Sequence, residues 1–496
     1  MASKRLAQKE LSQKARIKNP FPLKPIPHIR PFKSEVELKK VKVHFIKRHH
    51  PIVLKFSEND RYSKRPSFKL LASIMRSSKD TLKLDLHFQD IYRPKIQEIH
   101  YISKGIKDLS SLQKINLVVP SCNLATDLGF EILTQGLKAL SSLQSVSLWI
   151  PEGSHITENG LKVLCQSLKG LCKLRNLEIH FDRDSDITDK GLDFICWSLK
   201  RLAFLEKFHI GFTHCKNITE VGLFRLSGTL RRMASLRCLS LRFYHCGKIT
   251  EAWFCEICDI LIKLTCLKNI SLDFTGHEQI TNKGLLCLSK NLKKLPGLQT
   301  LDLYFRNFQW INDEGLESIS QSLDWLLSLK RVTLSFEDCY RVTDKGLQCL
   351  TKGLGKLVFL QSLRMGFSDA FKITDEGVTN FCKVLKKFPD LKEFYFHIQE
   401  CPRFTNVGWS NMYEILVSLP SLKEIELGKR WNGRSLISIQ GHKEIRKRLK
   451  SVVFRDVKRI SWLRSKLEKC WEFFMKRKRP KRRRSKSSEK ISKEAE

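Results

Sequence analysis

The cysteines are the residues whose spacing could most directly support chemistry in this chain. The sequence has 16 of them, and Cys255 and Cys258 have the C-x-x-C spacing that many zinc ligands share. No second C-x-x-C pair or paired histidine accompanies them, and both fall within an expected helix. Most of the other cysteines return at fixed intervals, as small buried residues do in a repeated fold. We therefore predict that the cysteines pack in the core and that the protein holds neither a metal ion nor another cofactor.

Other catalytic patterns are missing from the sequence as well. It contains no glycine-rich phosphate-binding loop and no recognisable nucleophile motif, and its histidines are scattered over several segments. We predict that the protein is not an enzyme. The chain also begins without the apolar core of a secretory signal, and its cysteines do not form a disulfide pattern, so we expect a cytoplasmic and/or nuclear location.

A formal charge of +39 is the strongest feature of the composition. Residues 1–50 contribute +11 and residues 430–496 contribute +17, so the long middle of the chain is close to an ordinary mixed-charge surface. The basic ends suit contact with RNA or an acidic protein. No apolar run is long enough to predict a transmembrane segment. The densest basic run resembles a nuclear-import or anion-binding signal and consists of Lys476, Arg477, Lys478, Arg479, Lys481, Arg482, Arg483 and Arg484, with Pro480 among them.

The elements that carry these residues are set by an internal repeat of 31 residues. A threonine, or once an asparagine, marks the same point of ten successive units without any insertion. These residues are Thr126, Thr157, Thr188, Thr219, Thr250, Thr281, Asn312, Thr343, Thr374 and Thr405. Two further units upstream keep the apolar pattern, which gives about twelve units in all.

Each unit changes its hydrophobic period halfway. After Thr188, apolar residues recur every three or four positions from Leu192 to Leu202, and then alternate from Phe208 to Phe212. The first pattern predicts a helix and the second a short strand. One helix and one strand cannot bury their own apolar faces, so the units must stack into a solenoid with parallel strands on one side and helices on the other.

The start of each predicted helix follows a fixed pattern. The threonine is placed to cap the helix, and an acidic residue usually follows it. Glycine recurs two residues after the acid, where we expect neighbouring backbone to approach closely; Trp253 takes this position in one unit and predicts a local distortion. Basic residues recur at the helix ends, and we attribute both sets of charges to the helix dipoles. A stripe that tracks a nucleic-acid backbone is the alternative.

The repeat resembles a known family. In five units a cysteine lies four residues before the threonine, at Cys122, Cys215, Cys246, Cys339 and Cys401. Together with the L-x-x-L-x-L-x-F strand and the I-T-D-x-G-L motif, this looks like a leucine-rich repeat of the cysteine-containing subclass found in F-box-type substrate receptors. The helical part is longer than in that subclass and is closer to ribonuclease-inhibitor-like repeats. The resemblance implies an α/β solenoid, curved as a horseshoe with strands on the concave side and helices on the convex side.

Four segments follow from these patterns. Residues 1–63 form a basic, proline-rich extension and residues 64–429 the leucine-rich repeats. Residues 430–475 form a basic amphipathic helical cap, and residues 476–496 a disordered basic tail. Within the cap, residues 443–475 also suit a calmodulin-like partner or an anionic membrane surface.

The concave side is the best candidate for a binding surface. Two side chains per strand point to it, and aromatic residues and arginine are the types that dominate protein interfaces. The predicted partner-binding residues are Trp149, His180, Arg242, Tyr304 and Tyr395. The alternative is internal pairing, of Arg242 with Asp273 and of Glu178 with His209.

We therefore predict a noncatalytic scaffold that binds a protein partner on its concave face. One alternative is a nucleic-acid or ribonucleoprotein component that uses its basic tails. Another is the substrate-recognition subunit of a ubiquitin ligase, although no adaptor-binding segment is visible before residue 60.

Overall fold

We describe the protein from a computed structural model. The structure describes residues 52–56, 68–88, 95–118, 126–150, 156–182, 187–247, 249–399 and 401–428. The predicted amphipathic cap, the basic tail with its import signal and most of the N-terminal extension lie outside these residues. The chain divides into two compact units, residues 1–217 and residues 218–496.

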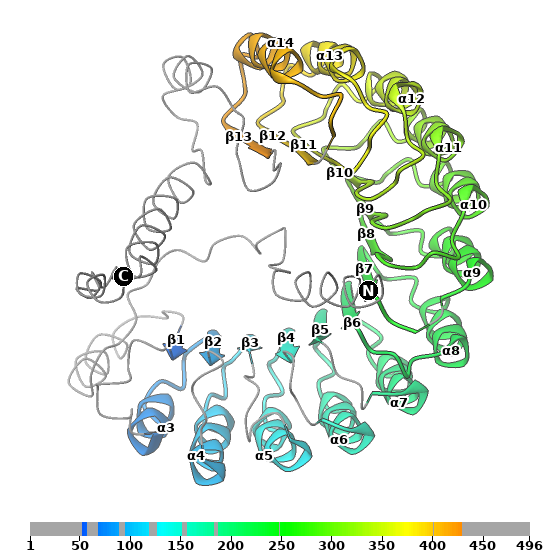
Figure 1. Cartoon of the computed structure of the whole chain (residues 1–496). Helices are drawn as coiled ribbons and strands as arrows, with labels where there is room; N and C mark the ends of the chain where they lie inside the picture. The colour runs from blue at the N-terminus through cyan, green and yellow to red at the C-terminus, as the bar shows by residue number, and fades with distance from the viewer. Residues whose placement is uncertain are drawn as a thin grey trace, which may run out of the picture. The chain divides into compact units, whose positions relative to one another are not determined.

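In the first unit, strands and helices alternate along the chain. Its strands are parallel and pair in chain order, and Figure 1 shows its helices along one side of them. The elements are β1 (Ile52–Phe56), α3 (Phe68–Arg76), β2 (Lys83–Phe88), α4 (Ile96–Lys107), β3 (Lys114–Val118), α5 (Asp127–Leu137), β4 (Ser145–Ile150), α6 (Glu158–Leu168), β5 (Asn176–Asp182), α7 (Asp189–Leu199) and β6 (Lys207–Thr213).

The second unit repeats this arrangement. Its strands are again parallel and pair in chain order. The elements are α8 (Glu220–Leu230), β7 (Cys238–Tyr244), α9 (Glu251–Leu261), β8 (Asn269–Asp273), α10 (Asn282–Leu292), β9 (Thr300–Tyr304), α11 (Asp313–Leu323), β10 (Arg331–Ser335), α12 (Asp344–Leu354), β11 (Ser362–Ser368), α13 (Asp375–Val384), η3 (Leu385–Lys387), β12 (Glu393–Gln399), α14 (Asn406–Val417) and β13 (Glu424–Gly428).

These elements confirm the predicted α/β solenoid of about twelve repeats. Neighbouring strands pair residues that are 31 apart, as Leu301 pairs with Val332 and Val332 with Leu363. The first strand is an addition to the predicted repeats, because β1 lies within residues 1–63. Its Ile52 pairs with Leu84, which is one residue further than the repeat period.

The core of each unit lies between strands and helices. Stacked phenylalanines from successive repeats run through it in the second unit: Phe305 and Phe336 have ring centroids 5.8 Å apart, and Phe336 and Phe367 6.1 Å apart. All three side chains are fully buried. Burying each such ring stabilises the fold by about 1.5–3 kcal/mol, and the stack adds to the contribution of the other buried apolar residues of each repeat.

The predicted helix caps are present in all ten units. Each threonine, or Asn312, accepts a hydrogen bond from a backbone N–H in the first turn of its own helix. The acid that begins a helix has a second role beyond the helix dipole. Asp344 accepts hydrogen bonds from the backbone N–H of Thr374 at 2.9 Å and from its hydroxyl at 2.6 Å. Asp313 makes the same pair of bonds with Thr343. At these positions the acid therefore joins one helix to the next, and in α10 Asn282 takes this role by accepting from the backbone N–H of Asn312 at 3.2 Å.

These acids also explain the recurring glycine. A Cβ atom on Gly346 would lie 2.5 Å from Oδ1 of Asp313, and one on Gly160 would lie 2.6 Å from Oδ1 of Asp127. The close neighbour is thus mainly the acidic side chain of the preceding repeat, and not only backbone as expected. In α9 this glycine is replaced by Trp253. Its side chain is fully buried, and its indole N–H donates to Oγ of Ser227 at 3.1 Å. Helix α9 keeps its eleven residues, so the expected distortion does not shorten it.

The cysteines of the loop position are buried where the structure describes them. Cys339 donates to the carbonyl oxygen of Phe305 in the preceding repeat at 3.2 Å, and Cys401 donates to that of Phe367 at 3.6 Å. His277 occupies the same position in another repeat. None of the helices in the described part of the chain is long and apolar enough to cross a membrane.

Candidate protein-binding face

The strands set which side chains are available for binding. In β5 and β7, buried positions alternate with half-buried ones. The buried positions face the helices, and the others form what we call the open face of each unit, the side expected to be concave. Trp149, His180, Arg242 and Tyr304 lie half-buried on this face. Tyr395 lies on it too but is only 7% exposed.

In the first unit, two of the predicted residues contact each other. The rings of Trp149 and His180 have centroids 5.4 Å apart, and Nε2 of His180 lies 3.0 Å from Oε1 of Glu178. A Cβ atom on Gly211 would collide with the His180 ring, so the neighbouring strand leaves space for the imidazole. The result is a half-buried aromatic pair backed by a carboxylate.

The electrostatics of Glu178 follow from these neighbours. Burial alone would raise the pKa of its carboxyl. The hydrogen bond from His180, the charges of His180 and His209, and the hydroxyl of Ser147 outweigh burial and lower the pKa to about 2. Glu178 hydrogen-bonds to His180 on its own strand, and the charge of His209, its partner in the alternative prediction, also lowers its pKa.

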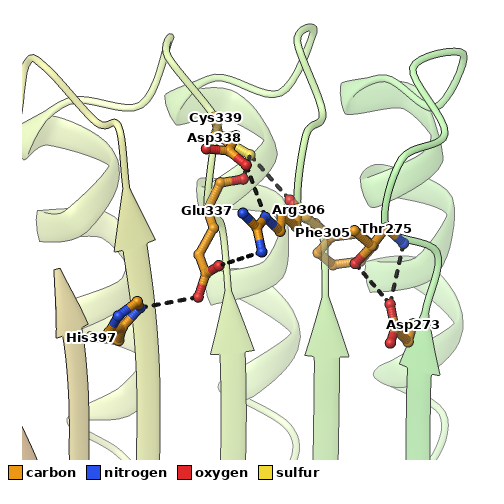
Figure 2. Close-up of polar contacts among 8 residues, drawn as sticks. All are labelled: Asp273, Thr275, Phe305, Arg306, Glu337, Asp338, Cys339 and His397. Carbon is orange, nitrogen blue, oxygen red and sulfur yellow. Dashed lines mark hydrogen bonds and ion pairs between the residues drawn. The ribbon is translucent and has the colours of Figure 1, made fainter. Parts of the chain in front are cut away.

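In the second unit, Arg242 pairs with Asp273 on the next strand. Nε of Arg242 lies 3.2 Å from Oδ2 of Asp273, as the alternative prediction held. Oδ1 of Asp273 accepts from the backbone N–H of Thr275 at 3.2 Å and from its hydroxyl at 2.8 Å, as Figure 2 shows. Tyr304 is opposite Asp273 in the strand register, and burial raises the pKa of its phenol. The arginine is therefore held in place beside a protonated phenol.

Tyr395 is placed differently from the other four residues. The guanidinium carbon of Arg364 lies 4.0 Å from the centroid of its ring, and burial raises the pKa of its phenol. Nη2 of Arg364 lies 3.8 Å from Oε2 of Glu393. The tyrosine ring therefore supports Arg364, which is the more accessible group of the pair.

A second charged cluster lies just beyond the strand ends, and sequence analysis missed it. Nε of Arg306 donates to Oδ2 of Asp338 at 2.9 Å, and its Nη1 lies 3.6 Å from Oε2 of Glu337. Nδ1 of His397 lies 3.3 Å from Oε1 of Glu337. Figure 2 shows these residues converging from three repeats, with the strand β11 lying between Glu337 and His397. We call Arg306, Glu337, Asp338 and His397 the Arg306 cluster.

The charges of the Arg306 cluster reinforce one another. Burial opposes the charge of Arg306, but the hydrogen bond and charge of Asp338 and the charge of Glu337 raise its pKa further above the ordinary value. The pKa of His245 is lowered, first by burial and then by the positive charge of Arg306. The cluster thus presents a permanent cation between two carboxylates.

A recurring backbone turn positions the cluster. His245, Asn307, Asp338 and Asp369 have positive φ angles of 47°, 64°, 59° and 54° at the same point of successive repeats, and Gly276 takes this point with a φ of 87°. Asparagine, aspartate and histidine tolerate this left-handed conformation better than most residues do. Extending the alternating strand pattern by two residues from Tyr304 and Ser335 would have predicted Arg306 and Glu337 on the open face.

The structure also bears on the cysteine pair considered as a metal site. Among the described residues, no three His, Cys, Asp or Glu side chains are placed to hold a metal ion. Cys255 and Cys258 lie in α9 beside Cys287 of α10. The hydrogen bond from Cys258 lowers the pKa of the Cys287 thiol to about 6, against the opposing effect of burial.

In the described residues, the structure brings four of the predicted residues into two groups. Within the first unit it brings Trp149 and His180 together, and within the second it brings Arg242 beside Asp273 and Tyr304. No protein-family model matches the chain, and no curated protein sequence is detectably similar to it.

Proposed function

We propose that this protein is a noncatalytic interaction scaffold of the leucine-rich repeat type, whose open face binds a protein partner. Support comes from the contrast between the two sides of each strand. The side that faces the helices carries the same kind of apolar residue in every repeat, as solenoid packing requires. The open face instead changes from repeat to repeat.

The observation that carries the proposal is the set of half-buried groups on this open face. Arg242 is held by Asp273 at 3.2 Å beside Tyr304, and the Arg306 cluster follows along the same face. Held side chains lose little conformational entropy when a partner binds, and arginine and tyrosine are typical of binding hot spots. Charges of both signs also allow a partner to be chosen by electrostatic complementarity.

A charge swap tests the proposal while it preserves the internal ion pair. The double variant Arg242→Asp with Asp273→Arg keeps opposite charges on the two strands but exchanges their positions. We expect it to stay folded and to unfold cooperatively, at a somewhat lower denaturant concentration than the parent chain, because position 273 no longer accepts the two hydrogen bonds from Thr275. We also expect it to recover at least tenfold less of the specific partner in affinity purification from cell extract, because a hot-spot contact is worth about 2 kcal/mol or more.

Arg232→Glu is the matched control. Arg232 is an exposed arginine of the same unit, beyond the end of α8 and outside the open face. Its reversal should leave partner recovery unchanged. If both variants lose the partner equally, the overall charge of the protein and not the open face determines binding. If the double variant loses none of the partner, Arg242 is not part of the binding surface.

A further inference from the structure

A second surface of the 218–428 region combines exposed aromatic rings with cations. It lies in the loops that lead into helices α11 to α14, on residues that are 31 apart. One column consists of Gln309, Tyr340, Phe371 and Pro402, and the next consists of Trp310, Arg341, Lys372 and Arg403. We call Trp310, Tyr340, Arg341, Phe371, Lys372 and Arg403 the aromatic–basic edge. Within these four repeats neither column contains an acidic residue; one repeat earlier the first column has Glu278, which accepts from Gln309 at 3.2 Å.

The rings of this edge are unusually accessible. Trp310 is 51% exposed, Tyr340 42% and Phe371 46%. The rings of Tyr340 and Phe371 are nearly parallel, with 7° between their planes and centroids 5.8 Å apart. The guanidinium carbon of Arg341 lies 4.7 Å from the centroid of the Trp310 ring. Contiguous apolar surface of this kind on a folded chain usually marks an interaction site.

The cations of the edge adjoin a shallow hollow of about 510 Å³. Its two acids are already engaged as acceptors: Asp313 takes two hydrogen bonds from Thr343, and Glu314 accepts from the side chain of Asn282 at 3.2 Å. Two further carboxylates act on Tyr340 through their charges, and Arg306 pairs with one of them. The hollow is lined by Asn312, Asp313, Glu314, Arg341, Thr343, Lys345 and Lys372.

The period of the edge limits what can bind along it. Two successive repeats each offer one aromatic ring and one cation, Tyr340 with Arg341 and Phe371 with Lys372. The matching ligand is a polymer with one flat π-face and one negative charge in every unit. Single-stranded nucleic acid has this composition, whereas an acidic peptide has the charge without a regular flat face. A duplex hides its base faces in its own stack.

We propose that the aromatic–basic edge binds single-stranded nucleic acid without strong sequence preference. Bases stack on Trp310, Tyr340 and Phe371, and phosphates contact Arg341 and Lys372. Stacking platforms that follow a positively charged path are the general means by which proteins hold single strands. The edge shares no residue with the open face or with the basic ends of the chain, whose charges alone would attract any nucleic acid.

The test uses the full-length chain and a fluorescently labelled uridine oligonucleotide of about 12 nucleotides, a length within the usual site size. Fluorescence anisotropy gives the dissociation constant. Tyr340→Ala should weaken binding about 5- to 150-fold, the range expected for the loss of one base stack. Tyr340→Phe keeps the ring and should bind as the parent does.

Salt dependence tests the cations separately. Each phosphate contact on a single strand contributes about 0.7 to the slope of log K against log salt concentration. The double variant Arg341→Ala with Lys372→Ala should therefore reduce the slope by about 1.4. The basic ends are present in every variant, so any contribution they make to the slope is the same in the parent chain and in the double variant.

Trp197→Ala is the matched control for an exposed ring among cations. Trp197 of α7 is 39% exposed, with Nζ of Lys169 at 5.5 Å and the guanidinium carbon of Arg201 at 5.3 Å from its centroid. Unchanged oligonucleotide binding in this control is expected. Parent-like affinity in both Tyr340→Ala and Phe371→Ala would overturn the proposal. Equal weakening of polyglutamate binding by Tyr340→Ala would overturn it in favour of an acidic protein.

Discussion

The link between successive helices can be tested at Asp313 in α11. Its carboxylate accepts from the backbone N–H of Thr343 at 2.8 Å and from the Thr343 hydroxyl at 2.7 Å. Asp313→Ala removes both acceptors and leaves a partly buried N–H without its partner. The variant also removes one negative charge from the start of the helix.

Glu314 lies in the same first turn and separates these effects. It is exposed and accepts from the side chain of Asn282 in the preceding helix at 3.2 Å, an exposed hydrogen bond that contributes little, so its main effect is on the helix dipole. A hydrogen bond to a charged group contributes about 1.5–3 kcal/mol, and an acid in the first turn about 0.3–1 kcal/mol. Asp313→Ala should therefore cost about 2–4 kcal/mol of unfolding free energy, and Glu314→Ala less than about 1 kcal/mol.

Urea unfolding followed by circular dichroism measures both values. Asp313→Asn retains one acceptor oxygen without the charge, and we expect it to fall between the parent and Asp313→Ala. If Asp313→Ala and Glu314→Ala have the same small effect, the acids serve only the helix dipoles, and the proposed link between helices is refuted.

Three further predictions address the packing and the titrating groups. Gly353→Ala should lower the melting temperature, because a Cβ atom there would lie 2.5 Å from the carbonyl oxygen of Ser320. Gly228→Ala should raise the melting temperature, because no atom lies within 4 Å of the added Cβ and alanine favours a helix more than glycine does. Shifts of the same sign in both variants would contradict this. Glu178 has its pKa lowered from 4.5 to about 2, so the stabilisation it gives is present above pH 4.5 and lost as the pH falls toward 2. Glu178→Gln should not lose stability over this pH range when it is unfolded in urea at a series of pH values. If its pH profile equals that of the parent chain, Glu178 does not cause the loss of stability in acid. Cys287 should react with iodoacetamide at pH 7 faster than its neighbours Cys255 and Cys258, because the hydrogen bond from Cys258 lowers the pKa of its thiol while burial raises theirs; peptide mapping that shows the opposite order would contradict this.

Much of the fold could be predicted from the spacing of single residues. Thr343 and its equivalents mark helix starts because each precedes a run in which apolar residues recur every three or four positions. At such a position the hydroxyl accepts a hydrogen bond from a free backbone N–H of the first turn. The strand positions follow in the same way from alternation. The strand β1 could not be found by this method, because Ile52 lies 32 residues before its partner and the period is 31.

The candidate site was only partly predictable. Trp149 and Arg242 were identified because they occupy outward positions of regular strands. Arg306 and Glu337 were missed because they lie beyond the strands, where the alternation was not followed. The contact of Arg364 with the ring of Tyr395 could not be predicted, because it depends on the directions of two side chains.

The sequence by itself determined the repeat, the period change within each unit, the helix caps and the unequal distribution of charge. These features are local, or they recur at one fixed distance, so they can be seen without coordinates. Only the tertiary structure decided which side chains meet across repeats: that Asp313 reaches Thr343, that Glu178 bonds to His180, and that Arg306 bridges two carboxylates. Such contacts depend on side-chain direction and on backbone turns to within about 1 Å, and neither the period nor the residue types specify these.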